Sequence, residues 1–285
     1  MSCLGSLREA RATGFDREVI ELGQPLTSMT FGASSRSRFL HELVTMHTPE
    51  GPESGRAPGV TVASDRISVD LHVGTHVDGL SHVALDGALH DGTDVSALGA
   101  EDPREGIAMR SGSGLRPIVA PGFLLDLPSY LECDALPDDH EITAAELRGC
   151  AERAEIGIEP GCVALIRTGF DSFWDTDPER YFGGSTPGLN LEAARFLRDG
   201  GVVATGSDTF VYEAFPSPSL LAVHAELLVK GGIFIIENLR LSALAARGVS
   251  SFEFIALPLN LPRATGSPLN PVAVINADRG SRSAL

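Results

Sequence analysis

The sequence predicts an α/β protein, a single domain with a mixed, largely buried β-sheet and flanking helices. Short apolar runs of strand length recur along the chain, and several are continuously apolar, which is typical of strands buried on both faces. The segments between these runs carry helix start signals. Strands that alternate with helices in this way indicate an α/β architecture.

The apolar runs predict the strands in chain order. A first strand begins in residues 66–83, where apolar and polar residues alternate. The later strands are expected at residues 122–127, 162–167, 202–205, 233–237, 254–259 and 272–275.

Three helices are predicted between these strands. Thr143 followed by Glu146 forms a capping box that starts the first, and Asn190 can cap the second, LEAARFLRDG. The third covers residues 220–230, with His224 and three leucines on one face, and ends at two glycines. We treat residues 1–285 as one domain, with about 15 N-terminal and about 10 C-terminal residues expected to be flexible.

The charge of the chain excludes polyanionic partners. It has 22 Lys+Arg and 38 Asp+Glu, so its formal net charge is 22 − 38 = −16. Binding to nucleic acid or to an anionic membrane surface needs clustered Lys and Arg, which this composition does not offer. We therefore expect a small-molecule substrate and neither a nucleic-acid nor a membrane partner.

The cysteines and the N-terminal residues predict a cytoplasmic protein. The four cysteines are widely spaced and form no Cys-x-x-Cys pair, so we expect reduced thiols. The N-terminus is charged throughout and lacks the apolar centre of a signal peptide. No apolar run approaches the roughly 20 residues that span a bilayer.

The segment RISVDLHVGTHVDGLSHV, residues 66–83, concentrates potential metal ligands. His72, His76 and Asp78 fall on the polar face of an alternating pattern, and His82 follows shortly after. Asp70 shares that face, and we expect it to be solvated or paired with Arg66. An exposed polar strand face is the ordinary alternative for such a pattern, but three histidines and an aspartate in phase favour a metal site.

Metal binding by this segment requires a bend. His72 and His76 would lie about 13 Å apart on a straight strand at about 3.3 Å per residue. Two ring nitrogens on one ion must approach within about 4 Å of each other. Gly74 between them is best able to bend the chain, so we predict a distortion at Gly74-Thr75.

A second candidate pair lies in VHAELLVKGGIFIIENL. His224 sits on the apolar face of its helix, and Glu237 ends a run of apolar residues in an expected buried strand. A buried carboxylate must be protonated, ion-paired or bound to a metal. His224 alone is equally compatible with a hydrogen-bonded core histidine, but together with Glu237 it favours a ligand role.

The segment HVGTHVDGLSH resembles the HxGTHxDxPxH signature of the cyclase family, metal-dependent hydrolases that include kynurenine formamidase and isatin hydrolase. HAELLVKGGIFIIENL, ALIRTGF, GLNLEAARFLRDGGVVATGSDT and GSPLNPVAVI are similar to further segments of that family, in the same order. The resemblance implies the family's swivelling β/β/α-like fold. It also implies a homodimer or homotetramer.

By position, the resemblance implies that His72, His76 and Asp78 bind a first metal ion. In members with two ions, Asp78 and Glu237 would bridge and His224 would hold the second. His82 matches the proton donor and acceptor. The cofactor is then one or two divalent ions, either Zn²⁺ or Mn²⁺, because this mixture of imidazole and carboxylate ligands suits both.

The sequence departs from the family at two places. Leu80 stands where the signature usually has proline, and the only tryptophan, Trp174, is far from the N-terminal tryptophan that contacts substrate in formamidases. Asp208 is a candidate either for lining the cleft or for orienting a ligand histidine. Other candidates for the pocket wall, which ordinary packing explains equally well, are Phe31, Phe39, His41, Met46 and His47.

The leading hypothesis is a hydrolase that opens a cyclic amide, a lactone or an aryl formamide with metal-activated water, His82 moving the proton. A lyase or cyclase would use the same groups to remove a proton or a hydroxyl without consuming water. A third reading is a metal-binding protein without catalysis, which the presence of His82 disfavours.

Overall fold

The protein is described by a computed structural model that covers residues 17–27, 30, 39–47, 56–57, 59–98, 103–110 and 114–276. Phe31 and the outermost residues at both termini lie outside these ranges, so the expectations for them concern residues that are not described. Among the described helices, none is both long and apolar enough to cross a membrane.

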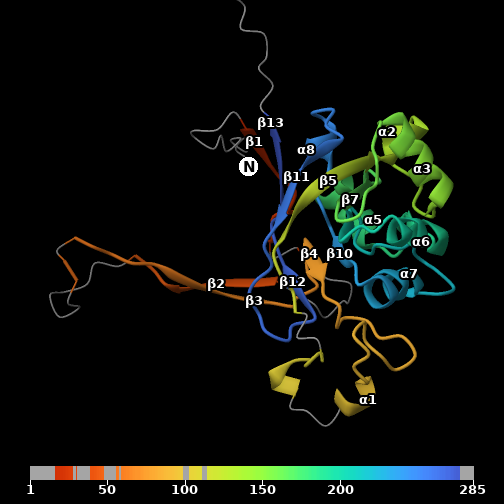
Figure 1. Cartoon of the computed structure of the whole chain (residues 1–285). Coiled ribbons are helices and arrows are strands. Elements are labelled where there is room, and N and C mark those ends of the chain that lie inside the picture. Colours follow the sequence, from red (N-terminus) through yellow and green to blue (C-terminus); the bar gives the residue numbers. More distant parts are fainter. Residues whose placement is uncertain are drawn as a thin grey trace, which may run out of the picture.

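A nine-stranded mixed sheet forms the centre of the molecule (Figure 1). Strands β5, β7, β9 and β10 are parallel to one another, and antiparallel strands extend the sheet on both sides. This confirms the predicted mixed sheet. Its order is β1 (Arg17–Glu21), β13 (Val272–Asn276), β11 (Ser251–Ala256), β5 (Ile118–Asp126), β7 (Val163–Arg167), β9 (Ala204–Ser207), β10 (Phe234–Glu237), β4 (His76–Asp78) and β12 (Gly266–Pro268).

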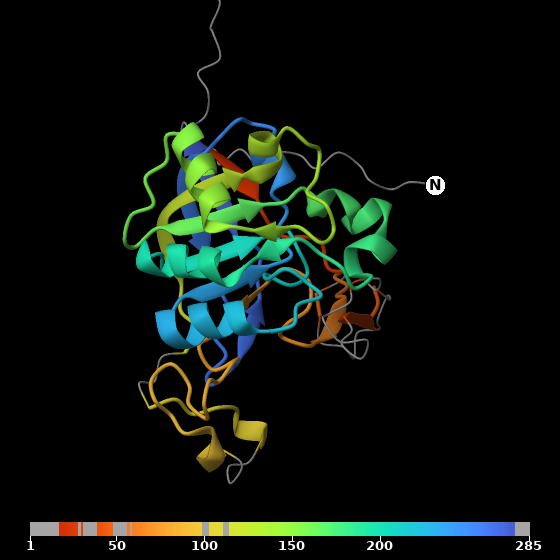
Figure 2. The ribbon, with the colours of Figure 1, turned by 90° about the vertical axis from the view of Figure 1, so that its right-hand side faces the viewer.

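Helices cover one face of this sheet. They lie to its right in Figure 1 and in front of it in Figure 2, which views the molecule from that side. This layer contains α2 (Leu127–Leu131), α3 (Ala144–Arg153), α6 (Leu191–Asp199) and α7 (Ala222–His224), which continues into the π-helix η4 (Ala225–Gly231). The shorter helices are α1 (Val95–Leu98), α4 (Phe173–Thr176), α5 (Pro178–Phe182) and α8 (Ser242–Ala245), with single 3₁₀ turns η2 (Pro103–Glu105) and η3 (Phe170–Ser172).

The predicted helix caps are confirmed. Thr143 and Glu146 form both hydrogen bonds of the capping box at the start of α3, and the Asn190 side chain accepts a hydrogen bond from Ala193 N–H, 2.9 Å away, at the start of α6. The third helix differs in type, because only its first turn is α-helical and the rest is η4. Leu220 lies before it and is exposed rather than on the buried face.

The predicted strands from residue 118 onward are confirmed with small shifts at their ends. β5 begins four residues before the predicted strand at 122–127, and β9 ends two residues beyond the predicted 202–205. β11 runs three residues earlier than the predicted 254–259, because its register pairs residues 251–256 with β5. Leu257 and Leu259 are therefore exposed beyond the strand.

The first predicted strand is divided into two, which corrects the expectation of one alternating strand through residues 66–83. β3 (Ser64–Val69) ends before the histidines and pairs only with β2 (Phe39–Thr45), and the chain enters the main sheet at β4. These two strands form a projecting arm, shown in orange on the left of Figure 1. Ile67 is 57% exposed there, because the arm is remote from the core. A third pairing, β6 (Glu141–Ile142) with β8 (Gly188–Leu189), is short.

Candidate metal centre

The chain bends sharply at Gly74, as predicted. Gly74 has φ +62°, and a β-carbon on it would collide with the Leu26 side chain. Such a left-handed conformation favours glycine. Next to it, the Thr75 hydroxyl donates to the Asn238 carbonyl oxygen at 2.5 Å and accepts from Gln24 N–H at 2.7 Å. The bend brings the ring centroids of His72 and His76 to 5.3 Å, where a straight strand would keep them far apart.

The register of the sheet joins the two candidate segments. β4 and β10 are antiparallel neighbours, with Glu237 opposite His76 and Ile235 opposite Asp78. Side chains that are cross-strand partners, or two positions apart on one strand, point to the same face of a sheet. His76, Asp78 and Glu237 therefore converge on one buried spot.

Two imidazoles face two carboxylates at this spot. His76 Nε2 lies 3.5 Å from Asp78 Oδ1 and 3.4 Å from Glu237 Oε2. His224 Nε2 lies 3.5 Å from Asp78 Oδ2 and 3.2 Å from Glu237 Oε1. All four side chains are buried. The Nε2 atom of each histidine therefore faces one oxygen of Asp78 and one oxygen of Glu237.

The electrostatics of the cluster indicate a place for positive charge. Burial alone would raise the pKa of Asp78 and Glu237, but hydrogen bonds from the histidines hold the pKa of Asp78 well below its usual value and lower that of Glu237. Burial alone would lower the pKa of His76, but Asp78 and Glu237 raise it to about 10. The pKa of His224 is likewise raised well above its usual value, against burial, by Asp78, Glu213 and Glu237.

The donor set fits a divalent cation. Without one, protons on the two imidazoles balance the two buried carboxylates, and cations must replace those protons to bind. Imidazole nitrogens mixed with carboxylate oxygens are ligands that zinc and similar ions accept. His76, Asp78 and Glu237 offer ligand atoms that all lie within 4.8 Å of one another.

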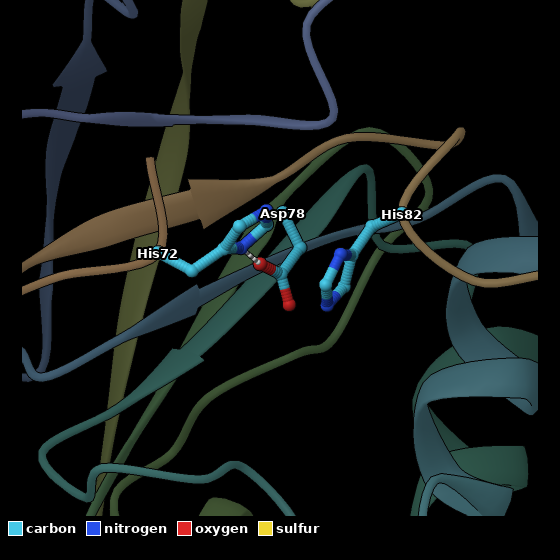
Figure 3. A group of neighbouring side chains, drawn as sticks. All are labelled: His72, Asp78 and His82. Atoms are coloured by element: carbon cyan, nitrogen blue, oxygen red, sulfur yellow. Dashed lines mark hydrogen bonds and ion pairs between the residues drawn. The ribbon is translucent and has the colours of Figure 1, made fainter. Parts of the chain in front are cut away.

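His72 and His82 lie beside Asp78 (Figure 3), and both are less buried than it is. His72 Nδ1 is 2.7 Å from Asp78 Oδ1, and its Nε2 is 3.1 Å from the Thr265 hydroxyl. The ring of His82 stacks on that of His72, with centroids 4.0 Å apart and planes 26° apart. The predicted ligands thus form two groups that share Asp78, and His72 belongs to the group with His82 rather than to the group with Glu237.

The loop that carries His82 keeps its shape without the family's proline. Gly79 N–H donates to the Thr265 carbonyl oxygen at 2.7 Å, and His82 N–H donates to the Gly79 carbonyl oxygen at 2.9 Å. Leu80 is buried beneath this turn. Backbone hydrogen bonds and an apolar anchor therefore fix the position of His82.

Glu213 is a functional candidate that sequence reasoning missed. Its carboxylate accepts hydrogen bonds from the backbone N–H groups of Leu221, Val223 and His224, and it lies 3.3 Å from His224 Nδ1. A carboxylate on the far nitrogen of a ligand histidine fixes the ring and its protonation. Glu213 lies eleven positions before His224 in an irregular segment, so no local pattern marks it.

Asp208 does not perform that role. Its carboxylate accepts hydrogen bonds from the Thr168 N–H and hydroxyl, both at 2.7 Å, and from Gly169 N–H at 2.8 Å. Its oxygens therefore hold the loop that follows β7. Of the two roles considered for Asp208, orientation of a ligand histidine belongs to Glu213 instead.

The remaining pocket candidates lie on the arm. Phe39 is buried at its base, whereas His41, Met46 and His47 are exposed along it. His41 pairs with Asp65, and His47 bonds to the Thr61 hydroxyl. The arm projects away from β4 and β10 (Figure 1), so the exposed side chains along it do not wall the metal centre of their own chain. Trp174 packs in a separate aromatic core with Tyr181 and Phe182.

Comparison with known proteins places these observations in a family context. A family model described as a putative cyclase matches residues 20–214. The kynurenine formamidase of Bacillus cereus is 27% identical over 255 residues, 90% of this chain and 96% of that protein. A solved structure described as a novel cyclase is 26% identical with a TM-score of 0.76, over 90% of this chain and 86% of that chain. Isatin hydrolase A from Ralstonia solanacearum shares the fold, with a TM-score of 0.66 at 20% identity, over 91% of this chain and 92% of that chain.

Proposed function

The chain belongs to the cyclase family of metal-dependent hydrolases, and from this premise we propose that it opens a cyclic amide, a lactone or an aryl formamide at the metal centre. The observation that carries the proposal is the pair of buried carboxylates, Asp78 and Glu237, each facing two imidazole nitrogens. The relative named kynurenine formamidase supports an amide as the bond that is broken.

We propose the ligand assignment that the family resemblance implies. His72, His76 and Asp78 would hold a first ion, and His224 with Asp78 and Glu237 would hold a second. Zn²⁺ and Mn²⁺ both suit these ligands. When bound, the cation would polarise the substrate carbonyl and lower the pKa of a water molecule.

His82 is our candidate for proton transfer. Its ring stacks on that of His72, and burial of the ring lowers its pKa below the usual value, which favours the neutral form. A neutral ring nitrogen can accept the proton of the attacking water and return it to the leaving nitrogen or oxygen. His82 lies outside the buried cluster, and the part of its side chain that His72 does not cover is exposed, so a substrate can reach it.

A substrate panel tests the reaction class. We expect aryl formamides, cyclic amides or lactones to be turned over, with activity lost after chelation and restored by Zn²⁺ or Mn²⁺. In ¹⁸O-water the product should carry one label, because hydrolysis consumes a water molecule. The calcium complex of the same chelator is the matched control. Unlabelled product would indicate the lyase or cyclase alternative, and full activity in protein shown to be metal-free by elemental analysis would contradict the mechanism.

We also propose that the chain works as a homodimer or homotetramer. The arm exposes apolar side chains on both strands, and its charged groups pair with one another, Arg66 with Glu42 and His41 with Asp65. A two-stranded hairpin is marginally stable alone, so such a surface favours a partner. The exposed apolar residues of the arm are Leu40, Leu43, Val44, Met46, Val60, Val62 and Ile67.

Light scattering after size exclusion tests the assembly. We expect the parent mass to be a multiple of the 30.0 kDa chain and the double variant Leu43→Glu/Val44→Glu to shift toward the monomer, because it places charges on the apolar surface. Leu131→Glu is the matched control, since Leu131 is an exposed leucine on α2, away from the arm. A monomeric parent would contradict the proposal.

We propose a cytoplasmic location. Cys133, Cys150 and Cys162 are free thiols, which suits a reducing compartment.

A further inference from the structure

Asn238 directly follows Glu237 at the end of β10 and forms hydrogen bonds through both its backbone and its side chain. It is buried, and its backbone is left-handed with φ +57°, which is uncommon for a residue with a side chain. Its N–H donates to the Thr209 carbonyl oxygen at 2.9 Å, and its carbonyl oxygen accepts from the Thr75 hydroxyl. Its side-chain oxygen accepts from the Tyr181 hydroxyl at 3.0 Å, and its side-chain nitrogen donates to the Gly74 carbonyl oxygen at 3.0 Å.

The Gly74 carbonyl links this residue to the metal centre. The same oxygen lies 2.8 Å from His76 Nδ1. A carbonyl oxygen only accepts hydrogen bonds, so the His76 nitrogen that faces it must carry a proton. When the ring is neutral, His76 then presents the lone pair of Nε2 to Asp78 and Glu237, which is the form that binds a metal.

Tyr181 helps to hold the Asn238 amide in place. The Tyr181 hydroxyl lies 3.0 Å from the Asn238 side-chain oxygen and 3.2 Å from the Asp208 backbone carbonyl oxygen, and the amide nitrogen faces the Gly74 carbonyl oxygen. A flipped amide would place two acceptor oxygens against each other in a buried site, which costs the desolvation of both. Tyr181 is itself fully buried and packs against Trp174 and Phe182.

We propose that Tyr181 and Asn238 are positioning residues that hold His76 in its metal-binding form through the Gly74 carbonyl. The aromatic core around α5 thereby sets the affinity of the metal centre without touching it. This inference rests on the proposed metal site and adds residues to it that contact neither metal nor substrate.

The test compares two variants, Tyr181→Phe and Tyr212→Phe, each of which removes only a hydroxyl group. Tyr212 is also fully buried, and its hydroxyl bonds to the Thr205 hydroxyl. Its contact with Glu237 is made by its backbone N–H, which Tyr212→Phe keeps. In competition with a chelator, we expect Tyr181→Phe to bind Zn²⁺ about tenfold more weakly than the parent, as for other outer partners of ligand histidines. Tyr212→Phe should bind it as the parent does. At saturating metal, kcat should fall more than KM changes for Tyr181→Phe.

Asn238→Asp separates positioning from charge. The added carboxylate would by itself strengthen cation binding, whereas loss of the N–H donor to Gly74 should weaken it, and we expect weaker binding. Tighter binding by Asn238→Asp, or equal effects of the two tyrosine variants, would overturn the inference while leaving the metal site intact. A parent that binds no metal would overturn both this inference and the proposed function.

Discussion

Replacing Asp78 by asparagine is expected to abolish metal binding and turnover together. The Asp78 carboxylate faces His72 at 2.7 Å and His76 and His224 at 3.5 Å each, so the three histidines share it. The asparagine side chain carries no charge, and its NH2 group is a hydrogen-bond donor that cannot bind the cation with the three histidines. We expect the affinity for Zn²⁺ or Mn²⁺ to fall by more than the roughly 100-fold limit typical of outer partners.

Asp70→Asn is the matched control for that variant. Asp70 lies in the same segment but is exposed, and its expected partner Arg66 pairs with Glu42 instead. Elemental analysis and chelator competition should show parent-like metal content in Asp70→Asn and none in Asp78→Asn. An Asp78→Asn protein that keeps a full complement of metal would exclude Asp78 as a ligand.

His82→Gln is expected to retain metal but to lose turnover by about 10²–10⁴-fold, the usual contribution of a proton-transferring side chain. The pH profile provides a second readout. A base acts when neutral, so a lowered pKa moves the acid limb of kcat/KM to lower pH. For the parent, this limb should lie below the ordinary histidine pKa of about 6.5, and it should disappear in His82→Gln.

A second exposed histidine supplies the control for His82. His90 bonds through Nδ1 to the Val229 carbonyl oxygen and takes no part in the cluster, so His90→Gln should keep the parent kinetics. Metal content measured at each pH separates loss of the base from loss of the ion. Parent-like turnover by His82→Gln would mean that another group moves the proton.

Features with a local cause were predictable from the sequence. The capping box of α3 and the N-cap of α6 depend on residues within one turn, and the bend at Gly74 follows from the spacing of two histidines. The approach of His224 and Glu237 to Asp78 was expected from the family resemblance. Burial also pointed to it, since a buried carboxylate needs a counter-charge.

Features that depend on tertiary contacts were not predictable in this way. Glu213 and Asn238 act through hydrogen bonds to distant backbone groups, and Tyr181 is one of several aromatic residues in its segment. The alternation in residues 66–69 was interpreted as part of the strand that carries the histidines, but among the described residues β3 pairs only with β2, on the arm. Periodicity reveals an apolar side without showing what covers it. The π-helix after His224 likewise has the apolar pattern of an α-helix.

The pairing of β4 with β10 also bears on the order in which the chain folds. The hydrogen bond between Gly74 and Asn238 closes a loop of 164 residues, which includes the whole parallel part of the sheet. Such distant closure costs chain entropy before any contact repays it, so we expect this pairing to form late in folding. A cation bound across β4 and β10 would then join the structure after its rate-limiting barrier. Such a cation would lower the rate of unfolding and would leave the rate of folding nearly unchanged.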